Sequence, residues 1–158
     1  QGINAGASSA YMSACIIVAQ LVMIPVSYLT GKLAPNGRKR LLLIGFAVLP
    51  IRGLLYTLTG DPILLVAIQI LDGVGAGIFG VLSILIVSDL TRGSGLFNTT
   101  QGAIATAVGL GASLSNAFAG MLLQQTSYNV AFLTLAALAL VALGVLWFLV
   151  PETGPKVS

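Results

Sequence analysis

Long apolar stretches separated by short polar links are the main feature of this sequence. Within each stretch the apolar residues run on without the alternation of a half-exposed strand, and most charged side chains fall in the links. The stretches span residues 9–29, 41–59, 62–88, 97–123 and 129–150. Each is close to or above the length of about 20 residues with which an α-helix crosses a bilayer. The pattern predicts an all-α fold, a polytopic transmembrane helix bundle with five spans.

The composition excludes a soluble globular domain. Apolar residues make up 57% of the chain and charged residues 7%, whereas soluble domains carry about 25% charged residues. A chain of 158 residues cannot bury this much apolar surface, because a domain of that size leaves roughly a third of its surface exposed. We therefore expect the lipid bilayer to cover the surface.

Basic residues are unevenly distributed over the links. Short links make neighbouring helices antiparallel, so alternate links lie on opposite sides of the membrane. The basic residues on one side are Lys32, Arg38, Lys39, Arg40, Arg92 and Lys156. The other side carries Asp61 and no basic residue. Because cytoplasmic loops are enriched in Lys and Arg, we expect a multi-pass protein of the cell membrane with the basic links and the C-terminus in the cytoplasm.

Residues that build common catalytic or metal sites are scarce. The chain has no His and one Cys, so neither a catalytic triad nor a metal site can be assembled from it. We therefore expect no enzyme activity, no catalytic residue, no metal and no cofactor. The net charge of +3 does not indicate nucleic-acid binding, because the basic residues gather at a membrane edge and no soluble domain remains.

Two charged residues fall inside predicted spans. Arg52 lies eight residues before the tight link at residues 60–62, and Asp72 lies ten residues after it. At 1.5 Å per residue both are roughly 12–15 Å from that membrane edge, near the middle of the bilayer. A lone charge at this depth costs about 2.5–3.5 kcal/mol, so we expect the two side chains to pair. Gln69, one helical turn before Asp72, is expected to share their network.

Two interpretations of this pair remain open. It is either a structural ion pair that fixes the register of two helices, or a functional one in which Asp72 titrates or contacts a solute while Arg52 adjusts its proton affinity. Gln20 and Gln101 are further candidates to line a cavity, because small residues flank both. Amide side chains in spanning helices also bond neighbouring helices, so this alternative remains open as well.

Small residues recur at helical spacing in two of the predicted spans. In the stretch 97–123 they form a ladder of every fourth residue: Ala103, Ala107, Gly111, Ser115 and Ala119. The stretch 62–88 has small residues on more than one face, Gly73, Gly75, Gly77 and Gly80, and we expect Gly73 and Gly77 to be contact points. Such positions let a second helix approach closely, either as static packing or as a surface that slides. The stretch 129–150 has almost no interior polar group and is expected to face lipid.

The link at residues 31–40 resembles the cytoplasmic loop signature of the major facilitator superfamily of secondary transporters. With one residue deleted, the matching positions are Gly31, Leu33, Ala34, Gly37, Arg38 and Lys39. Pro35 stands where the family has an acid, so the resemblance implies that the contact made by that acid comes from the other half of the transporter. The resemblance marks Gly31, Gly37, Arg38 and Lys39 as a conformational-switch loop.

The order of the later segments is also similar to that family. The glycine-rich run from Gln69 to Ala76 resembles the fourth helix of a six-helix half, the ladder corresponds to the fifth, and residues 151–153 resemble the tail after the last helix. This order implies helices eight to twelve of a transporter, an incomplete C-terminal half spanning residues 1–158.

The resemblance implies transport of a small solute by alternating access, with Asp72 as a proton-coupling or solute-adjacent carboxylate. In such halves the helix of Asp72 lines the cavity, the helix of Arg52 is peripheral, and the two remaining inner helices form the moving interface. The expected partners are the N-terminal half and the seventh helix of the same transporter, with an unknown small molecule as substrate. The alternative is a stand-alone five-helix membrane protein that acts as an accessory or partner-binding subunit.

Overall fold

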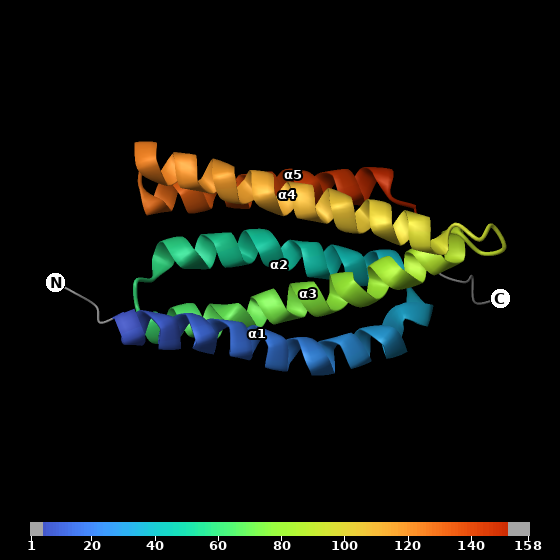
Figure 1. Cartoon of the computed structure of the whole chain (residues 1–158), viewed down its shortest axis with the longest axis horizontal. Coiled ribbons are helices and arrows are strands. Elements are labelled where there is room, and N and C mark those ends of the chain that lie inside the picture. Colours follow the sequence, from blue (N-terminus) through green and yellow to red (C-terminus); the bar gives the residue numbers. More distant parts are fainter. Residues whose placement is uncertain (1–4, 152–158) are drawn as a thin grey trace.

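The computed structural model describes residues 5–151, and over this range the chain forms five long α-helices that run along one common axis (Figure 1). The helices are α1 Ala5–Leu33, α2 Arg38–Leu58, α3 Pro62–Leu90, α4 Phe97–Gln125 and α5 Tyr128–Leu149, with a short 3-10 helix, η1 Ala34–Asn36, before α2. All five are long and apolar enough to cross a membrane. The links fall alternately at the two ends of the bundle (Figure 1).

The helix boundaries follow local chemistry. The side chain of Asp61 accepts a hydrogen bond of 2.8 Å from the Ile63 N–H, and Pro62 occupies the first helical position, so α3 begins directly at the turn. The side chain of Ser127 caps α5 by accepting from the Val130 N–H. The largest difference from the predicted ranges is in α1, which extends four residues further at each end, because polar residues continue a helix where the bilayer core gives way to its interface.

The helices pack in a defined order. α1 lies against α3, α3 lies against α2, and α2 lies against α5. Glycines allow the close approaches. A Cβ at Gly77 would lie 3.1 Å from the Met23 carbonyl oxygen of α1, and one at Gly73 would lie 2.8 Å from the Val22 Cβ. Gly73 and Gly77 therefore lie in the interface of α1 and α3, at the spacing of four that lets two helices meet closely.

α2 uses two further glycines that the sequence pattern did not single out. A Cβ at Gly45 would lie 2.9 Å from the Ile78 Cγ2 of α3, and one at Gly53 would lie 2.9 Å from the Ala136 Cβ of α5. Ala131, Ala136 and Leu146 of α5 are buried. One face of α5 therefore packs on α2, and only the remainder of this helix is free to face lipid.

α4 has few neighbours. It touches α3 and α5 but no part of it is buried, and every residue from 105 to 118 is exposed. The predicted ladder positions Ala107, Gly111 and Ser115 belong to this exposed stretch. Ser115 borders a hollow that α4 shares with α2 and α5, whereas a Cβ at Gly111 would meet nothing within 4 Å. A helix that covers Ala107 and Gly111 therefore comes from outside the described residues.

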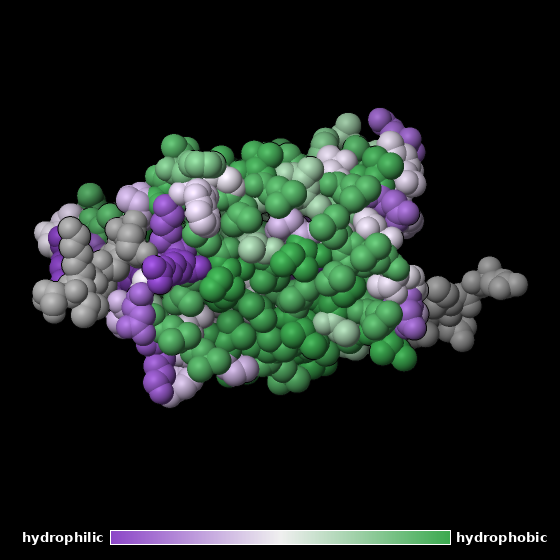
Figure 2. Space-filling view, turned by 180° about the vertical axis from the view of Figure 1, so that it is seen from behind, coloured by the Kyte–Doolittle hydropathy of each residue, from purple (hydrophilic) through white to green (hydrophobic). Residues whose placement is uncertain are grey.

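Apolar side chains cover the middle of the molecule, and polar side chains gather toward its two ends (Figure 2). Large hydrophobic residues such as Phe148 (84% exposed) and Leu58 (78% exposed) point outward. A water-soluble protein does not expose so large an apolar surface. The surface is that of a helical bundle whose solvent is lipid, as predicted from composition.

Candidate functional site

The ion pair predicted from depth is present. Arg52 of α2 and Asp72 of α3 face each other, and a guanidinium nitrogen of Arg52 donates to a carboxylate oxygen of Asp72. The two side chains are 30% and 43% exposed. α2 ends and α3 begins at the same tight turn. Arg52 and Asp72 lie at similar distances from this turn along their helices, and this brings the two charges together. Both side chains are therefore only partly buried by the described residues.

Tyr56 and Gln69 extend the pair into a cluster. Tyr56 lies one turn after Arg52, with its ring centroid 5.7 Å from the Arg52 Cζ, a cation–π arrangement. The Gln69 amide donates a hydrogen bond of 2.8 Å to the Tyr56 hydroxyl oxygen. We call Arg52, Asp72, Tyr56 and Gln69 the charge cluster. Gln69 is connected to Arg52 through Tyr56, and among residues 5–151 it makes no hydrogen bond to Asp72.

Tyr56 is the functional candidate that the sequence pattern missed. Its position four residues after Arg52 places both side chains on one face of α2, and this spacing was the available signal. The ring also stacks on Phe132 of α5, with centroids 5.0 Å apart. Tyr56 therefore joins α2, α3 and α5 at one point.

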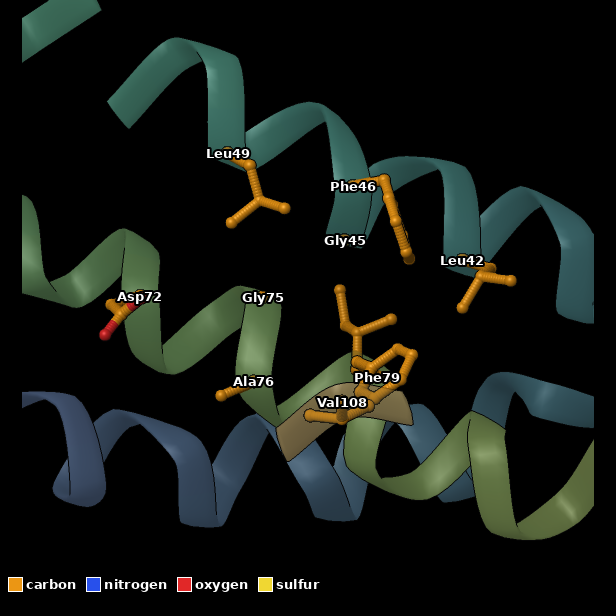
Figure 3. A pocket seen from close by; sticks show the side chains of 10 residues that line it. Leu42, Gly45, Phe46, Leu49, Asp72, Gly75, Ala76, Phe79 and Val108 are labelled. Atoms are coloured by element: carbon orange, nitrogen blue, oxygen red, sulfur yellow. The ribbon is translucent and has the colours of Figure 1, made fainter. Parts of the chain in front are cut away.

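Asp72 stands at one end of an apolar hollow of about 320 Å³ between α2, α3 and α4. Figure 3 shows Leu42, Phe46 and Leu49 along α2 facing Gly75 and Phe79 of α3, with Asp72 at the end of the row. Val108 of α4 forms part of the wall. Among residues 5–151, the carboxylate is the only charged group that lines this hollow.

Two further hollows lie toward the α2–α3 turn. The hairpin hollow, of about 600 Å³, is lined by Tyr11, Cys15, Tyr56, Thr57, Leu58, Thr59, Gly60, Leu65, Gln69, Tyr128, Asn129 and Phe132. The Asp72 hollow, of about 470 Å³, is lined by Tyr11, Met12, Cys15, Ile16, Ala19, Gln20, Gln69 and Asp72. Gln20 thus shares a hollow with Asp72. Gln101 lies near the start of α4 and lines none of these three hollows.

The predicted switch loop lies at the opposite end of the bundle, where it contacts two other helices. Arg38 forms an ion pair with Asp89 at the end of α3, and it also donates to the Leu85 carbonyl oxygen at 3.2 Å. The Lys39 ammonium donates to the Trp147 carbonyl oxygen at 2.8 Å, in the last turn of α5. The start of α2 therefore holds the ends of α3 and α5 together. Asp89 was not predicted as a partner, although it is the acid of the neighbouring link.

The two glycines of this loop have different surroundings. Gly37 has a φ of 141°, a conformation that residues with a Cβ rarely adopt, so it allows the sharp change of direction between η1 and α2. Gly31 lies in α1, and a Cβ there would meet nothing within 4 Å. Within residues 5–151 no group of three or more His, Cys, Asp or Glu side chains is placed to hold a metal ion.

Comparison with known proteins identifies the family. The Major Facilitator Superfamily profile matches residues 2–158. The chain is 50% identical over 153 residues to two Mycobacterium tuberculosis proteins, uncharacterized MFS-type transporter MT2531 of strain CDC 1551 / Oshkosh and uncharacterized MFS-type transporter Rv2456c of strain H37Rv. The match covers 95% of this chain and 36% of each relative. No solved structure matches the chain. On this profile match and its five apolar helices, the chain belongs to the major facilitator superfamily of multi-pass membrane transporters.

Proposed function

We propose that this chain is part of a secondary active transporter that moves a small solute by alternating access and couples that movement to protons. The observation that supports the proposal is the Arg52–Asp72 pair: a carboxylate and a guanidinium near the middle of the membrane, partly exposed to hollows. Charged groups at this depth are costly and are found mainly along solute, ion or proton pathways.

The chemistry of coupling follows from the pairing. While Asp72 is ionised, its charge is balanced by Arg52. A proton taken up by the carboxylate removes that balance and leaves the guanidinium without an anionic partner in a medium that penalises lone charges. Arg52 then favours a polar or anionic group of the solute, or a shift of α2 against α3. Gln20 offers an amide donor and acceptor in the same hollow as the carboxylate, and Gln101 acts at the moving interface on α4.

The loop that contains Gly31, Gly37, Arg38 and Lys39 acts as the conformational switch in this proposal. Its ties to Asp89 and to the end of α5 hold one end of the bundle closed, and they separate when that end opens. We place this basic end in the cytoplasm and the α2–α3 turn outside the cell membrane, because the described links carry their Lys and Arg residues at the basic end alone.

The rest of the transporter covers α4 in this proposal. The chain spans 36% of the length of the relatives it matches, and the small-residue ladder of α4 lies open to a further helix. We propose that the chain supplies helices eight to twelve, and that the N-terminal half and the seventh helix come from the same polypeptide. The open face of α4 also suits a separate partner chain, which is the basis of the accessory-subunit alternative.

Transport by the full-length protein in vesicles tests the proposal. Vesicles that contain the protein and an internal pH-sensitive dye are mixed with single members of a panel of small organic solutes, without an imposed pH gradient. We expect at least one solute to drive proton movement that protein-free vesicles do not show. Solute movement without protons would contradict the coupling, and the absence of any solute-driven flux across the panel would favour the accessory-subunit alternative.

A further inference from the structure

The hairpin hollow and the Asp72 hollow meet at a shared wall. Three residues line both hollows: Tyr11, Cys15 and Gln69. The hairpin hollow reaches the turn at Thr59 and Gly60, whereas the Asp72 hollow reaches the carboxylate. Whatever passes from the α2–α3 turn to Asp72 along this side of α3 therefore passes these three side chains.

Gln69 is the wall residue that is hydrogen-bonded to Tyr56. Its amide donates to the Tyr56 hydroxyl oxygen at 2.8 Å. The Tyr56 ring is in turn fixed on two sides, because it stacks on Phe132 and faces the Arg52 guanidinium. Within the charge cluster, a single neutral hydrogen bond thus connects Gln69, the cluster's member in this wall, to Tyr56.

The other two members of the wall are held differently. The Tyr11 hydroxyl donates to the Pro62 carbonyl oxygen at 3.3 Å, in an exposed position at the start of α3, and the Tyr11 side chain is also hydrogen-bonded to Cys15. Neither contacts Tyr56 by a hydrogen bond in the part of the chain that the structure describes. Gln69 is therefore the wall residue whose position depends on a hydrogen bond to Tyr56.

We propose that the Gln69–Tyr56 hydrogen bond is an access gate between the α2–α3 turn and Asp72. With the bond formed, Gln69 separates the hairpin hollow from the Asp72 hollow. With the bond broken, Gln69 turns away and the two hollows become one continuous passage for water, protons and solute. The gate rests on the proposed function, since it gives the transporter its access to Asp72 from this end.

Thiol labelling of the full-length protein tests the gate without a known substrate. Cysteines other than the reporter are replaced by serine, and the reporter is Ala19→Cys, which lines the Asp72 hollow but not the hairpin hollow. A membrane-impermeant methanethiosulfonate reagent is added from the side of the α2–α3 turn. We expect Tyr56→Phe and Gln69→Leu each to raise the labelling rate about 3- to 10-fold, the change in open population when a neutral hydrogen bond is lost.

Matched controls make the outcome specific. Tyr128→Phe removes a hydroxyl from the hairpin hollow that does not bond Gln69, so the reporter rate should stay at the parent value. The double variant Tyr56→Phe, Gln69→Leu should label no faster than either single variant, because both remove one bond. In a second protein that keeps Cys15 as its only cysteine, Cys15 should label at the same rate with or without Tyr56→Phe, since it already lines the hairpin hollow.

An unchanged Ala19→Cys rate in both single variants would overturn the gate, as would an equal increase in Tyr128→Phe. If a single variant changes the labelling rate of Cys15, that substitution has disturbed the hairpin hollow itself. The Ala19→Cys labelling rate of the other single variant then decides whether the gate exists. The labelling uses neither solute nor proton gradient, so it is independent of the vesicle assay that tests the proposed function. Unchanged labelling together with solute-driven proton flux would reject the gate alone. Faster labelling in the variants without solute-driven proton flux would reject the coupling alone.

Discussion

Arg52 and Asp72 lie on different helices, and their side chains are 30% and 43% exposed. Partial exposure weakens the pair relative to a fully buried one, because water in the neighbouring hollows solvates part of each charge. It also leaves the carboxylate open to protons from the neighbouring hollows. The same geometry therefore accommodates the structural and the functional interpretation, and variants of the two residues separate them.

Single and double neutral variants measure the structural part of the pair. We expect Asp72→Asn and Arg52→Gln each to destabilise the full-length protein by about 1–3 kcal/mol, because each leaves one charge without its partner. The double variant Arg52→Gln, Asp72→Asn should lose less than the sum of the two. Thermal unfolding in detergent, followed by size-exclusion chromatography of the heated samples, gives the comparison. A double variant that loses the full sum would show that the two side chains do not interact.

At the scale of helices, glycine positions decide how closely elements meet. Gly73 and Gly77 let the backbone of α1 approach α3, whereas Gly80 of the same helix has open space around its Cβ position. The sequence pattern offered all three glycines for close packing and did not separate Gly80 from the other two, and it also marked the ladder on α4. Among residues 5–151 no helix approaches the ladder closely: a Cβ at Gly111 would meet nothing within 4 Å, and Ser115 borders an open hollow. Small residues permit a close approach but do not specify which helix makes it.

Alanine at two glycines of α3 tests this reading of the α1–α3 interface. In Gly73→Ala the new methyl group would meet the Val22 Cβ and the Ala19 carbonyl oxygen, so we expect a loss of about 1–3 kcal/mol from overpacking. Gly80→Ala meets nothing within 4 Å and should be neutral or stabilise α3 by up to about 1 kcal/mol. Melting temperatures of the two variants check the prediction. Equal effects at both positions would contradict it.

At the scale of the whole molecule, the five spans, the apolar surface and the Arg52–Asp72 pair could be predicted, because each follows from run length, composition or depth along the chain. Tyr56, Asp89 and Phe132 could not. An aromatic residue at helical spacing is most often core packing, and contacts between residues such as Arg38 and Asp89 depend on how the ends of three helices meet. The cover of α4 depends on chain outside the described residues.

Spin labels on α4 show whether the rest of the transporter covers this helix. Gly111 of the ladder and Ser113 are both exposed, neither lines the hollow that α4 shares with α2 and α5, and residues two apart point to opposite faces of a helix. In the full-length protein we expect a nitroxide at Gly111→Cys to be immobile and shielded from oxygen, and one at Ser113→Cys to be mobile and accessible to oxygen in the lipid. Equal oxygen accessibility at both positions in vesicles would contradict a covering helix on the ladder.

The central claim is that Asp72 couples protons to solute movement, and the most direct measurement compares two aspartate variants in vesicles. With a solute that drives proton movement in the parent protein, we expect Asp72→Asn to retain exchange of labelled solute across the membrane but to lose the accompanying proton flux. Asp61→Asn, which changes only the cap at the start of α3, should retain both. Proton flux in Asp72→Asn equal to that of the parent, in correctly folded protein, would contradict the account.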